Sequence, residues 1–521
     1  MANNIQTRLA DALERARVSA RKEVVKSASL RRSDRELLLQ RGYLQDICKG
    51  WYLLTRPTQK PGESTAWYAA FWDFLSVYLD ERFRGDYCLS AVSSMDAQVG
   101  TNVVPRQVTA ITAHGGKTAL ELPHHTSVLV YQDTKNLPRT VDVVDGLRVM
   151  PLALALCRVP VTFFQAHGTD AEIALRAVKS VDDLVRIILD IGSPGLAGRL
   201  AGAYQFLGDN ERAQQIVKAA GAAGIAFQSE NPFAKPTPVF AGATRLVSPY
   251  AGRIEALFRT MREPVLAVFK KVKPRTVSEP EAYIRQVEEV YQHDAYNSLS
   301  IEGYRVTPEL IEKIRLGQWN PDQHPEDQGQ IAAMAARGFL EAFRLVQKSV
   351  RRVLHGEVAA VVARNDYQDW YRALFGESVR AGLLEAYHLA GHRSGRVFIH
   401  SSRHVPPPSD AVNDAMTALF ENLRTEREPI VRAVLGHFLF GFIHPYLDGN
   451  GRMARFLMNV MMASGGYSWT IVRTDRRKEY LDALETASTE HNIVPFARFI
   501  GEEMSIDWSK VPVKKNRGSS S

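Results

Sequence analysis

The stretch His444-Pro-Tyr-Leu-Asp-Gly-Asn-Gly-Arg-Met-Ala-Arg455 decides the fold of the second half of this 521-residue chain. It is a polar, glycine-containing loop between two apolar segments of residues 428–464, and this pattern predicts a helix, a tight turn and a second helix. Gly449 and Gly451 let the backbone turn with its amides inward, and the second helix begins directly after them. The loop therefore predicts an active site that binds an anion.

The polar side chains of this loop suit phosphate chemistry. Arg452 and Arg455 lie three residues apart on the first turn of the second helix, so both guanidiniums can hold phosphate oxygens on one side. Asp448 supplies a lone carboxylate of the kind that Mg²⁺ takes alongside substrate phosphates. His444, with an ordinary pKa of about 6.5, is mostly neutral at pH 7 and can accept a proton from a hydroxyl. A phosphate cradle, a metal ligand and a base thus lie within one loop.

The loop resembles the signature of the Fic family, whose members transfer the AMP part of ATP onto protein hydroxyls. The resemblance covers roughly Glu279 to Glu503 and implies a mostly α-helical domain with a short β-hairpin flap, with ATP and Mg²⁺ as cofactors. Tyr446 stands where phenylalanine is usual, and we expect it to anchor the loop in the core. Phosphotransferring relatives of the Doc type have lysine at the position of Gly451, so the glycine favours transfer of AMP.

The same resemblance implies a role for each residue of the loop. His444 would be the general base and Asp448 the ligand of Mg²⁺. The remaining residues would hold the nucleotide: Gly449, Asn450 and Gly451 the α-phosphate region, and Arg452 and Arg455 the outer phosphates.

Ser298-Leu-Ser-Ile-Glu302-Gly303 resembles the family's inhibitory motif. Its position ahead of the signature is similar to that in the class with an N-terminal inhibitory helix. The resemblance implies that Glu302 pairs with Arg455 and holds the enzyme back. Taken alone, Glu302 would be an ordinary solvated helix carboxylate.

Two further segments have weaker family likenesses. Arg396-Val-Phe-Ile-His400, followed by Pro406-Pro-Pro-Ser, resembles the flap hairpin, which lends a strand edge to the target segment and borders the nucleotide. This likeness places Val397, Phe398, Ile399 and His400 at the nucleotide. The segment 478–484 resembles a downstream helix whose aromatic residue lies near the adenine, which nominates Tyr480.

His437 lies seven residues before His444, on the same face of the expected helix. Such a histidine can be read as a metal ligand or as a core residue. We favour core packing.

The basic charge of the chain is concentrated at its N-terminus. Residues 1–60 contain 13 Lys+Arg and 6 Asp+Glu, whereas the whole chain has a net charge of +8. The pattern predicts helices over Thr7–Ser19 and after Ser33, where a capping box begins, and a β-hairpin around Lys49-Gly50. This order resembles the N-terminal winged helix of AbiEi-type antitoxin regulators, and the likeness continues to about residue 225. Contact with DNA is one expectation, and an ordinary solvated surface is the other.

The sequence predicts a multidomain protein: a winged helix and an α/β region, followed by a mostly α-helical Fic domain. The expected boundaries are 1–60 for the winged helix, 61–227 for the α/β AbiEi-like region, 228–250 for a linker, 251–505 for the Fic domain with its inhibitory helix, and 506–521 for a disordered tail.

We expect a cytoplasmic protein adenylyltransferase that modifies a hydroxyl of a target protein and is autoinhibited by Glu302. Three widely spaced cysteines argue against a disulfide framework, and the longest apolar stretch, Pro151 to Phe164, is interrupted by Arg158, so no membrane span is expected. Two alternatives stay open. The site can run in reverse and remove AMP, with Glu302 orienting water, or the chain can be a DNA-binding antitoxin-like regulator with a Fic sensor domain. A winged helix often works as a homodimer.

Overall fold

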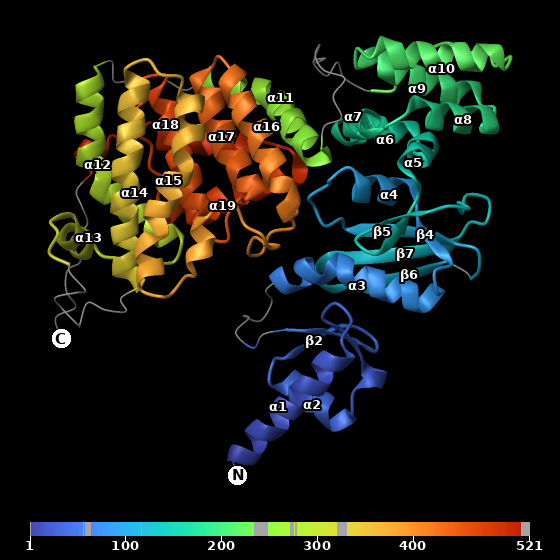
Figure 1. The fold of residues 1–521 in the computed structure, drawn as a ribbon, viewed down its shortest axis with the longest axis horizontal. Helices are drawn as coiled ribbons and strands as arrows, with labels where there is room; N and C mark the ends of the chain where they lie inside the picture. Colours follow the sequence, from blue (N-terminus) through green and yellow to red (C-terminus); the bar gives the residue numbers. More distant parts are fainter. Residues whose placement is uncertain are drawn as a thin grey trace. The chain divides into compact units, whose positions relative to one another are not determined.

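The computed structural model describes residues 2–55, 57, 64–115, 117–233, 248–270, 276, 279–319 and 331–511. The chain divides into two compact units, whose elements are labelled in Figure 1. The first unit comprises Met1–Pro249 together with Phe398–Val405, and the second comprises Tyr250–Val397 and Pro406–Ser521.

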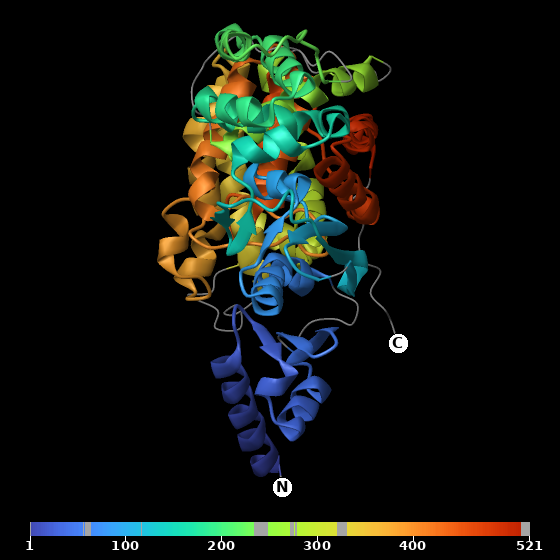
Figure 2. The same cartoon turned by 90° about the vertical axis from the view of Figure 1, so that its right-hand side faces the viewer.

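The first unit begins with a small helical and stranded segment, shown in dark blue in Figure 2. Its elements are α1 (Ala2–Ser19), β1 (Val24–Lys26), α2 (Arg32–Gln40), β2 (Leu44–Cys48) and β3 (Trp51–Leu54). The three strands form an antiparallel sheet in the order β1-β3-β2. Ala12, Ala16, Val25, Leu38 and Leu44 form the buried core of this segment, so helices and sheet pack as one body.

The predicted hairpin is confirmed, with Gly50 at a φ of +85° in the turn between β2 and β3. The predicted capping box is wrong. Helix α2 has its N-cap at Arg31, so Ser33 already lies inside the first turn and caps nothing. Glu36 accepts a hydrogen bond from Arg32 instead.

The next segment of the first unit is a mixed sheet covered by a long helix. Its elements are α3 (Thr65–Phe83), β4 (Tyr87–Leu89), α4 (Ala91–Gln98), β5 (Gln107–Thr112), β6 (Thr118–Leu122), β7 (Thr126–Gln132), β8 (Asp142–Val144) and β9 (Leu147–Val149). Four of these strands form the sheet β4-β5-β7-β6, in which only β5 and β7 are parallel among the described pairings. Phe71 and Phe74 of α3 share a buried core with Val108 of β5 and Val128 of β7. An α/β region between the N-terminal segment and the linker thus agrees with the sequence pattern.

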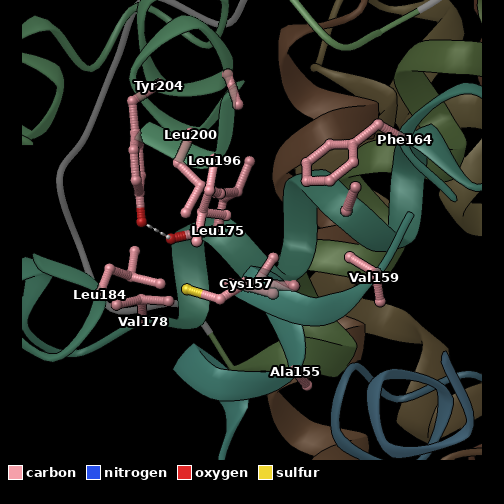
Figure 3. Close-up of a cluster of buried hydrophobic side chains, with 14 of the residues drawn as sticks. Ala155, Cys157, Val159, Phe164, Leu175, Val178, Leu184, Leu196, Leu200 and Tyr204 are labelled. Atoms are coloured by element: carbon pink, nitrogen blue, oxygen red, sulfur yellow. Dashed lines mark hydrogen bonds between the residues drawn. The ribbon is translucent and has the colours of Figure 1, made fainter. Parts of the chain in front are cut away.

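A helical segment completes the first unit. It consists of α5 (Leu152–Arg158), α6 (Val161–Ala166), α7 (Gly168–Ala177), α8 (Val181–Ile191), α9 (Pro194–Phe206) and α10 (Asn210–Ala222). Figure 3 shows its core, where Cys157, Leu196 and Leu200 are buried. The hydroxyl of Tyr204 donates to the carbonyl of Leu175 at 3.0 Å, which satisfies the one polar group of that side chain.

The predicted flap hairpin is wrong. The described residues from Arg396 to His400 contain no strand. Residues 398–405 belong to the first unit instead, where His404 forms an isolated antiparallel bridge with Val103. The amide of Val405 donates to Asn102 O at 2.7 Å, and the amide of Val104 donates to Arg403 O at 2.9 Å. The backbone of Arg403 and Val405 is therefore paired with residues 102–104, and the three prolines after Val405 have no N–H to extend a ladder.

The second unit is helical, apart from an isolated bridge between Thr276 and Tyr467, within the part that the structure describes. This confirms the mostly α-helical fold predicted for the second half. Its longer elements are α11 (Pro249–Phe269), α12 (Pro280–Ile301), α13 (Pro308–Arg315), α14 (Ile331–Leu354), α15 (Ala359–Arg380), α16 (Val412–Thr425), α17 (Pro429–Ile443), α18 (Asn450–Ala463), α19 (Arg477–Glu490) and α20 (Val494–Glu503).

Helices α17 and α18 form the centre of the second unit. Apolar residues lie on every side of α17, and nearly all of α17 and α18 is buried, which is the pattern of helices surrounded by others. Helices α14 and α15, drawn in yellow and orange in Figure 1, both pack against α18. The loop between α17 and α18 is thus held by a buried framework. Among the described helices, none has the length and apolar character needed to cross a membrane.

The expected linker, 228–250, falls mostly outside the described residues, and the expected tail does so from residue 512 onward. The division between the two compact units lies between Pro249 and Tyr250.

Candidate active site

His444 ends α17 and is held in a defined orientation. It adopts a left-handed conformation, with a φ of +53°, as the C-cap of the helix. Its Nδ1 lies 3.2 Å from the carbonyl oxygen of Gly441, and since a carbonyl only accepts, Nδ1 carries the proton. The other nitrogen, Nε2, is then the one with a free lone pair. Burial lowers the pKa of His444 to about 4, so the ring is neutral at pH 7.

Arg393 fixes the backbone of the loop on the side of His444. Its Nε donates to His444 O at 2.8 Å, and its own amide donates to Pro445 O at 2.9 Å. The guanidinium also donates to the carbonyls of Gly395 and Pro407. Burial lowers the pKa of Arg393 to about 10, which still leaves it charged at neutral pH. This residue is one that the sequence reasoning missed, because no local motif marks it.

The loop is closed by a pair of reciprocal hydrogen bonds between Asn450 and Tyr446. Tyr446 N donates to Asn450 Oδ1 at 2.9 Å, and Asn450 Nδ2 donates to Tyr446 O at 2.8 Å. The Asn450 side chain is therefore used to shape the turn, and only its backbone is available for a phosphate. The Tyr446 ring is 1% exposed and stacks on Tyr371 with ring centroids 3.6 Å apart. This confirms that Tyr446 anchors the loop in the core.

Gly449 is required where the loop meets α15. It has a φ of +82°, and a Cβ atom there would lie 2.6 Å from the ring of Phe375. The guanidinium of Arg452 lies 5.0 Å from the centroid of the Phe375 ring and 5.2 Å from the centroid of the Tyr304 ring. Arg452 is thus buried between two aromatic rings, a cation–π arrangement. Its Nη2 donates to Asp448 at 3.3 Å.

Asp448 is the exposed carboxylate of the loop, with 59% of its side chain accessible. The amide of Gly449 and the guanidinium of Arg452 donate to its two oxygens. No group of three or more His, Cys, Asp or Glu side chains that could hold a metal ion occurs within the described residues. A single accessible carboxylate next to an anion-binding turn fits a Mg²⁺ ion that takes its other ligands from substrate phosphates and water.

The predicted inhibitory residues meet Arg455. Ser298 lies in α12, and Glu302 is the residue that caps its C-terminus, followed by Gly303 at a φ of +90°. Arg455 Nη2 donates to Glu302 Oε1 at 2.7 Å, and Arg455 Nε donates to Ser298 Oγ at 3.1 Å. Burial opposes the charge of Glu302, but the arginines at 455 and 452 outweigh it and lower its pKa. The contact predicted between Glu302 and Arg455 is confirmed.

Gly451 allows Glu302 to approach the start of α18. A Cβ atom at position 451 would lie 2.5 Å from Glu302 Oε1 and 3.3 Å from Arg455 Nη1. The carboxylate therefore lies at the N-terminal end of that helix, where free amides and the helix dipole attract an anion.

Tyr480 lies in the core and offers no free ring face. It is 2% exposed, its hydroxyl is 2.7 Å from His437 Nε2, and its ring packs against Phe496 and Phe499. The place of Tyr480 beside the adenine stays a prediction, and in this structure its ring is packed in the core. His437 is 1% exposed, and burial lowers its pKa to about 3. It is a packed core histidine, as we favoured.

The structure brings together most, but not all, of the predicted site residues. His444, Asp448, Gly449, Asn450, Gly451, Arg452 and Arg455 share the loop and the first turns of α18, and Ser298, Glu302 and Gly303 join them from the end of α12. Of the predicted flap, Val397 belongs to the second unit, whereas Phe398, Ile399 and His400 belong to the first. Their place beside the nucleotide stays a prediction.

The sequence reasoning missed two more residues that a spacing argument could have found. Tyr304 follows Gly303 directly, so its contact with Arg452 shows that the segment after the inhibitory helix reaches the second arginine as well. Asp294 lies four residues before Ser298 on the same face of α12. Phe375 and Arg393 come from segments distant in sequence and carried no such signal.

A helix, a glycine turn and a second helix that starts with two arginines define a class of phosphate-binding site. Residues 362–462 match the family model described as Fic/DOC family, which includes this loop and much of α15 to α18. The chain thus contains a Fic/DOC-type region related to protein adenylyltransferases.

The similar proteins are distant relatives. "Protein adenylyltransferase Fic" from Nematostella vectensis is 29% identical over 230 residues, covering 43% of this chain and 49% of that protein. "Protein adenylyltransferase fic-1" from Caenorhabditis elegans is 25% identical over 225 residues, covering 42% and 40%. The chain spans about half or less of the length of these curated relatives. A solved structure of Fic-1 from C. elegans is 18% identical, covers 66% of this chain and 96% of that one, and has a TM-score of 0.36.

Proposed function

We propose that this protein is an adenylyltransferase of the Fic type, which transfers AMP from ATP to a hydroxyl side chain of a target protein. The observation that carries the proposal is the neutral His444, whose Nε2 is free while Nδ1 is bonded to Gly441 O, at the edge of a turn that leads into two buried arginines. The names of the relatives support the same reaction.

The reaction follows from these residues. The target hydroxyl gives its proton to His444 Nε2 while its oxygen forms a bond to the α-phosphorus of ATP. The bond from the α-phosphorus to the bridging oxygen breaks, and pyrophosphate leaves. The amides of the Gly449–Gly451 turn and the guanidiniums of Arg452 and Arg455 stabilise the negative charge that develops on the phosphate oxygens. Catalysis is therefore mainly positioning and charge stabilisation.

Asp448 is the residue that would hold Mg²⁺, which neutralises charge on the phosphates when it is bound. Asp448 also orients Arg452 through their hydrogen bond at 3.3 Å.

Glu302 sets the resting state in this proposal. Its carboxylate pairs with Arg455 and lies at the start of α18, so it competes with phosphate for the same groups. The same position suits the reverse reaction, in which a carboxylate near His444 would orient a water molecule toward a modified target and AMP would be released.

Two incubations test the proposal. The full-length protein is incubated with ATP labelled on the α-phosphate, with and without a lysate of its host, and label on protein supports transfer of AMP. A second incubation supplies modified protein without ATP, and release of labelled AMP would favour the reverse reaction. Label that stays in free nucleotide in the first incubation and on protein in the second, with Glu302→Gly also included, would contradict both.

We propose a second function for residues 1–54, the binding of DNA as a winged helix. The order α1-β1-α2-β2-β3 with the sheet β1-β3-β2 supports it, since a helix followed by a two-stranded wing is the form in which such domains meet DNA. Arg31 and Arg32 are exposed at the start of α2. A gel shift at low salt tests it, and equal binding by the full chain and by a chain starting at Ser64 would contradict it.

A further inference from the structure

Asp294 is a buried carboxylate that the proposed reaction does not use. It lies in α12, is 3% exposed, and has two hydrogen-bond donors. Ser298 Oγ donates to Asp294 Oδ1 at 2.9 Å, and Trp469 Nε1 donates to Asp294 Oδ2 at 2.9 Å. Burying a charged group costs free energy unless the group is paired and hydrogen-bonded. The position of Asp294 in the core therefore needs a structural or functional explanation.

The serine hydroxyl connects this carboxylate to the active site. A hydroxyl has one proton, and because that proton is given to Asp294, the lone pairs of Ser298 Oγ are left to accept. Arg455 Nε donates to this oxygen at 3.1 Å. The Ser298 carbonyl also accepts from Arg455 Nη2 at 3.2 Å. Asp294 therefore determines which way the hydroxyl points, and with it the edge of the guanidinium that Ser298 holds.

The Nη1 and Nη2 end of the Arg455 guanidinium is the part whose partner changes when Glu302 is released. Nη2 also donates to Glu302, and Nη1 has no hydrogen-bond partner among the described residues. Nη1 is the nitrogen that lies near Gly451. Loss of Glu302 thus frees the side of the guanidinium next to the glycine turn, while the contacts of Ser298 with Nε and Nη2 can persist.

We propose that Asp294 is a positioning residue for phosphate binding: through Ser298 it holds Arg455 in place both when Glu302 is bound and when Glu302 is released. Ser298 and Glu302 then have different tasks, although they belong to one motif. Glu302 blocks the site, whereas Asp294 and Ser298 keep Arg455 ready for a phosphate. This inference rests on the proposed function for its meaning, but its first test does not need any transfer of AMP.

The first test follows the Nε proton of Arg455 by NMR in protein labelled with ¹⁵N-arginine. We expect slow exchange of this proton with water in the wild type and in Glu302→Gly, and fast exchange in Asp294→Asn. Asparagine has the same shape but offers one acceptor oxygen, so it cannot serve both Ser298 and Trp469. Slow exchange in a folded Asp294→Asn variant would overturn the inference, whatever reaction the protein catalyses.

The second test measures nucleotide affinity in variants that cannot turn over. With Mg²⁺-ATP and the Glu302→Gly/His444→Ala protein as reference, adding Asp294→Asn should weaken binding about tenfold, the usual effect of losing a hydrogen bond to a charged group. Ser298→Ala should give the same loss, and Ser298→Thr, which keeps the hydroxyl, should not. These two variants keep the test decisive if Asp294→Asn does not fold. Equal affinity for Ser298→Ala and Ser298→Thr would overturn the inference.

Glu503→Gln is the matched control. Glu503 is also a buried carboxylate of the second unit, 1% exposed, but its partners are Arg473 and Arg476. The loss of this carboxylate should lower thermal stability and leave ATP affinity and the exchange rate of the Arg455 Nε proton unchanged.

The single variant Asp294→Asn should also fail to activate transfer of AMP. Activation equal to that of Glu302→Gly would place Asp294 in the inhibitory contact and overturn the separate role proposed here. If Glu302→Gly with its His444 intact binds labelled ATP but never transfers AMP, the proposed function fails, while the exchange and affinity measurements still decide the inference about Arg455.

Discussion

Glu302 and Gly451 are in such close contact that the residue at position 451 has no room for a side chain: a Cβ atom there would stand 2.5 Å from Glu302 Oε1. The carboxylate thus lies at the N-terminal end of α18 as well as beside Arg455. An anion at this point is favoured by the helix whether it belongs to the chain or to a nucleotide. Under the proposed function, a phosphate of the nucleotide and the Glu302 carboxylate would compete for this one place.

Gly451→Ala should reveal this contact in stability measurements. The added methyl group overlaps with the Glu302 carboxylate, and overpacking of this kind costs about 1–3 kcal/mol of the free energy of unfolding. In Glu302→Gly the overlap is absent, so the same substitution should cost less. Urea unfolding of the two single variants and the double variant measures the difference. Additive losses would show that position 451 does not contact residue 302.

Glu302→Gly should raise the transfer of AMP, both to the protein itself and to targets. The change removes the carboxylate that pairs with Arg455 and leaves the guanidinium for phosphate. A gel assay with ATP labelled on the α-phosphate measures it, and thermal melting reports any loss of stability from leaving Arg455 without its partner. A folded variant that transfers no more than the wild type would remove Glu302 from an inhibitory role. Glu312→Gly is a suitable control, because Glu312 pairs with the exposed Arg315.

His444→Ala should abolish transfer and leave ATP binding nearly intact. Removing a general base lowers a rate by about 10²–10⁴-fold, while the phosphates are held by the turn and by the arginines at 452 and 455. Transfer is measured in the Glu302→Gly background, where it should be highest, and binding by equilibrium titration with Mg²⁺-ATP. Near-normal transfer in the double variant would mean that another group takes the proton.

The free energy of unfolding should fall as the pH drops from about 6.5 to about 4. Burial lowers the pKa of His444 to about 4, whereas the unfolded chain has an ordinary value of about 6.5. In this window the unfolded state binds more protons, so acid favours it. His444→Gln should remove about 1–3 kcal/mol of that dependence in urea unfolding between these pH values. A profile for His444→Gln equal to that of the wild type would contradict the prediction.

Binding of DNA by the N-terminal segment should depend steeply on salt. If Arg31 and Arg32 bind phosphates, replacing both by glutamine should reduce the slope of log affinity against log salt by about 0.9 for each phosphate that is no longer neutralised. Fluorescence anisotropy with the full chain at several salt concentrations gives the slopes. Lys478→Gln, on α19 of the second unit, is the charge control. Slopes that are the same for the arginine variant and the control would exclude these two arginines from the interface.

The sequence predicted those parts of the structure whose signal is local. The loop from His444 to Arg455 and its two helices follow from a glycine turn between apolar runs. The hairpin around Gly50 follows from alternation and a turn residue. In each case neighbouring residues contain enough information to fix the backbone.

The missed parts depend on partners that are distant in the chain. The segment 396–400 contains three consecutive apolar residues and resembles the flap of the family, but the pairing of Val405 and Arg403 with residues 102–104 could not be seen from that segment alone. The family resemblance nominates Tyr480 for the adenine, whereas in the structure its ring packs against His437 and the phenylalanines of α20. Burial of a single aromatic side chain is set by the whole helical packing, and the sequence pattern does not determine it.

The position of residues 398–405 has a consequence for how this protein can be divided and inherited. The chain passes from one compact unit to the other at Pro249, at Val397 and again at Val405, so neither unit is a single continuous stretch. A gene fragment that encoded residues 250–521 alone would carry the eight-residue segment 398–405 without the edge of residues 102–104 that satisfies its backbone. Recombination at the linker would therefore leave unpaired amides and carbonyls in both products. The two halves are expected to be transmitted together as one unit of evolution.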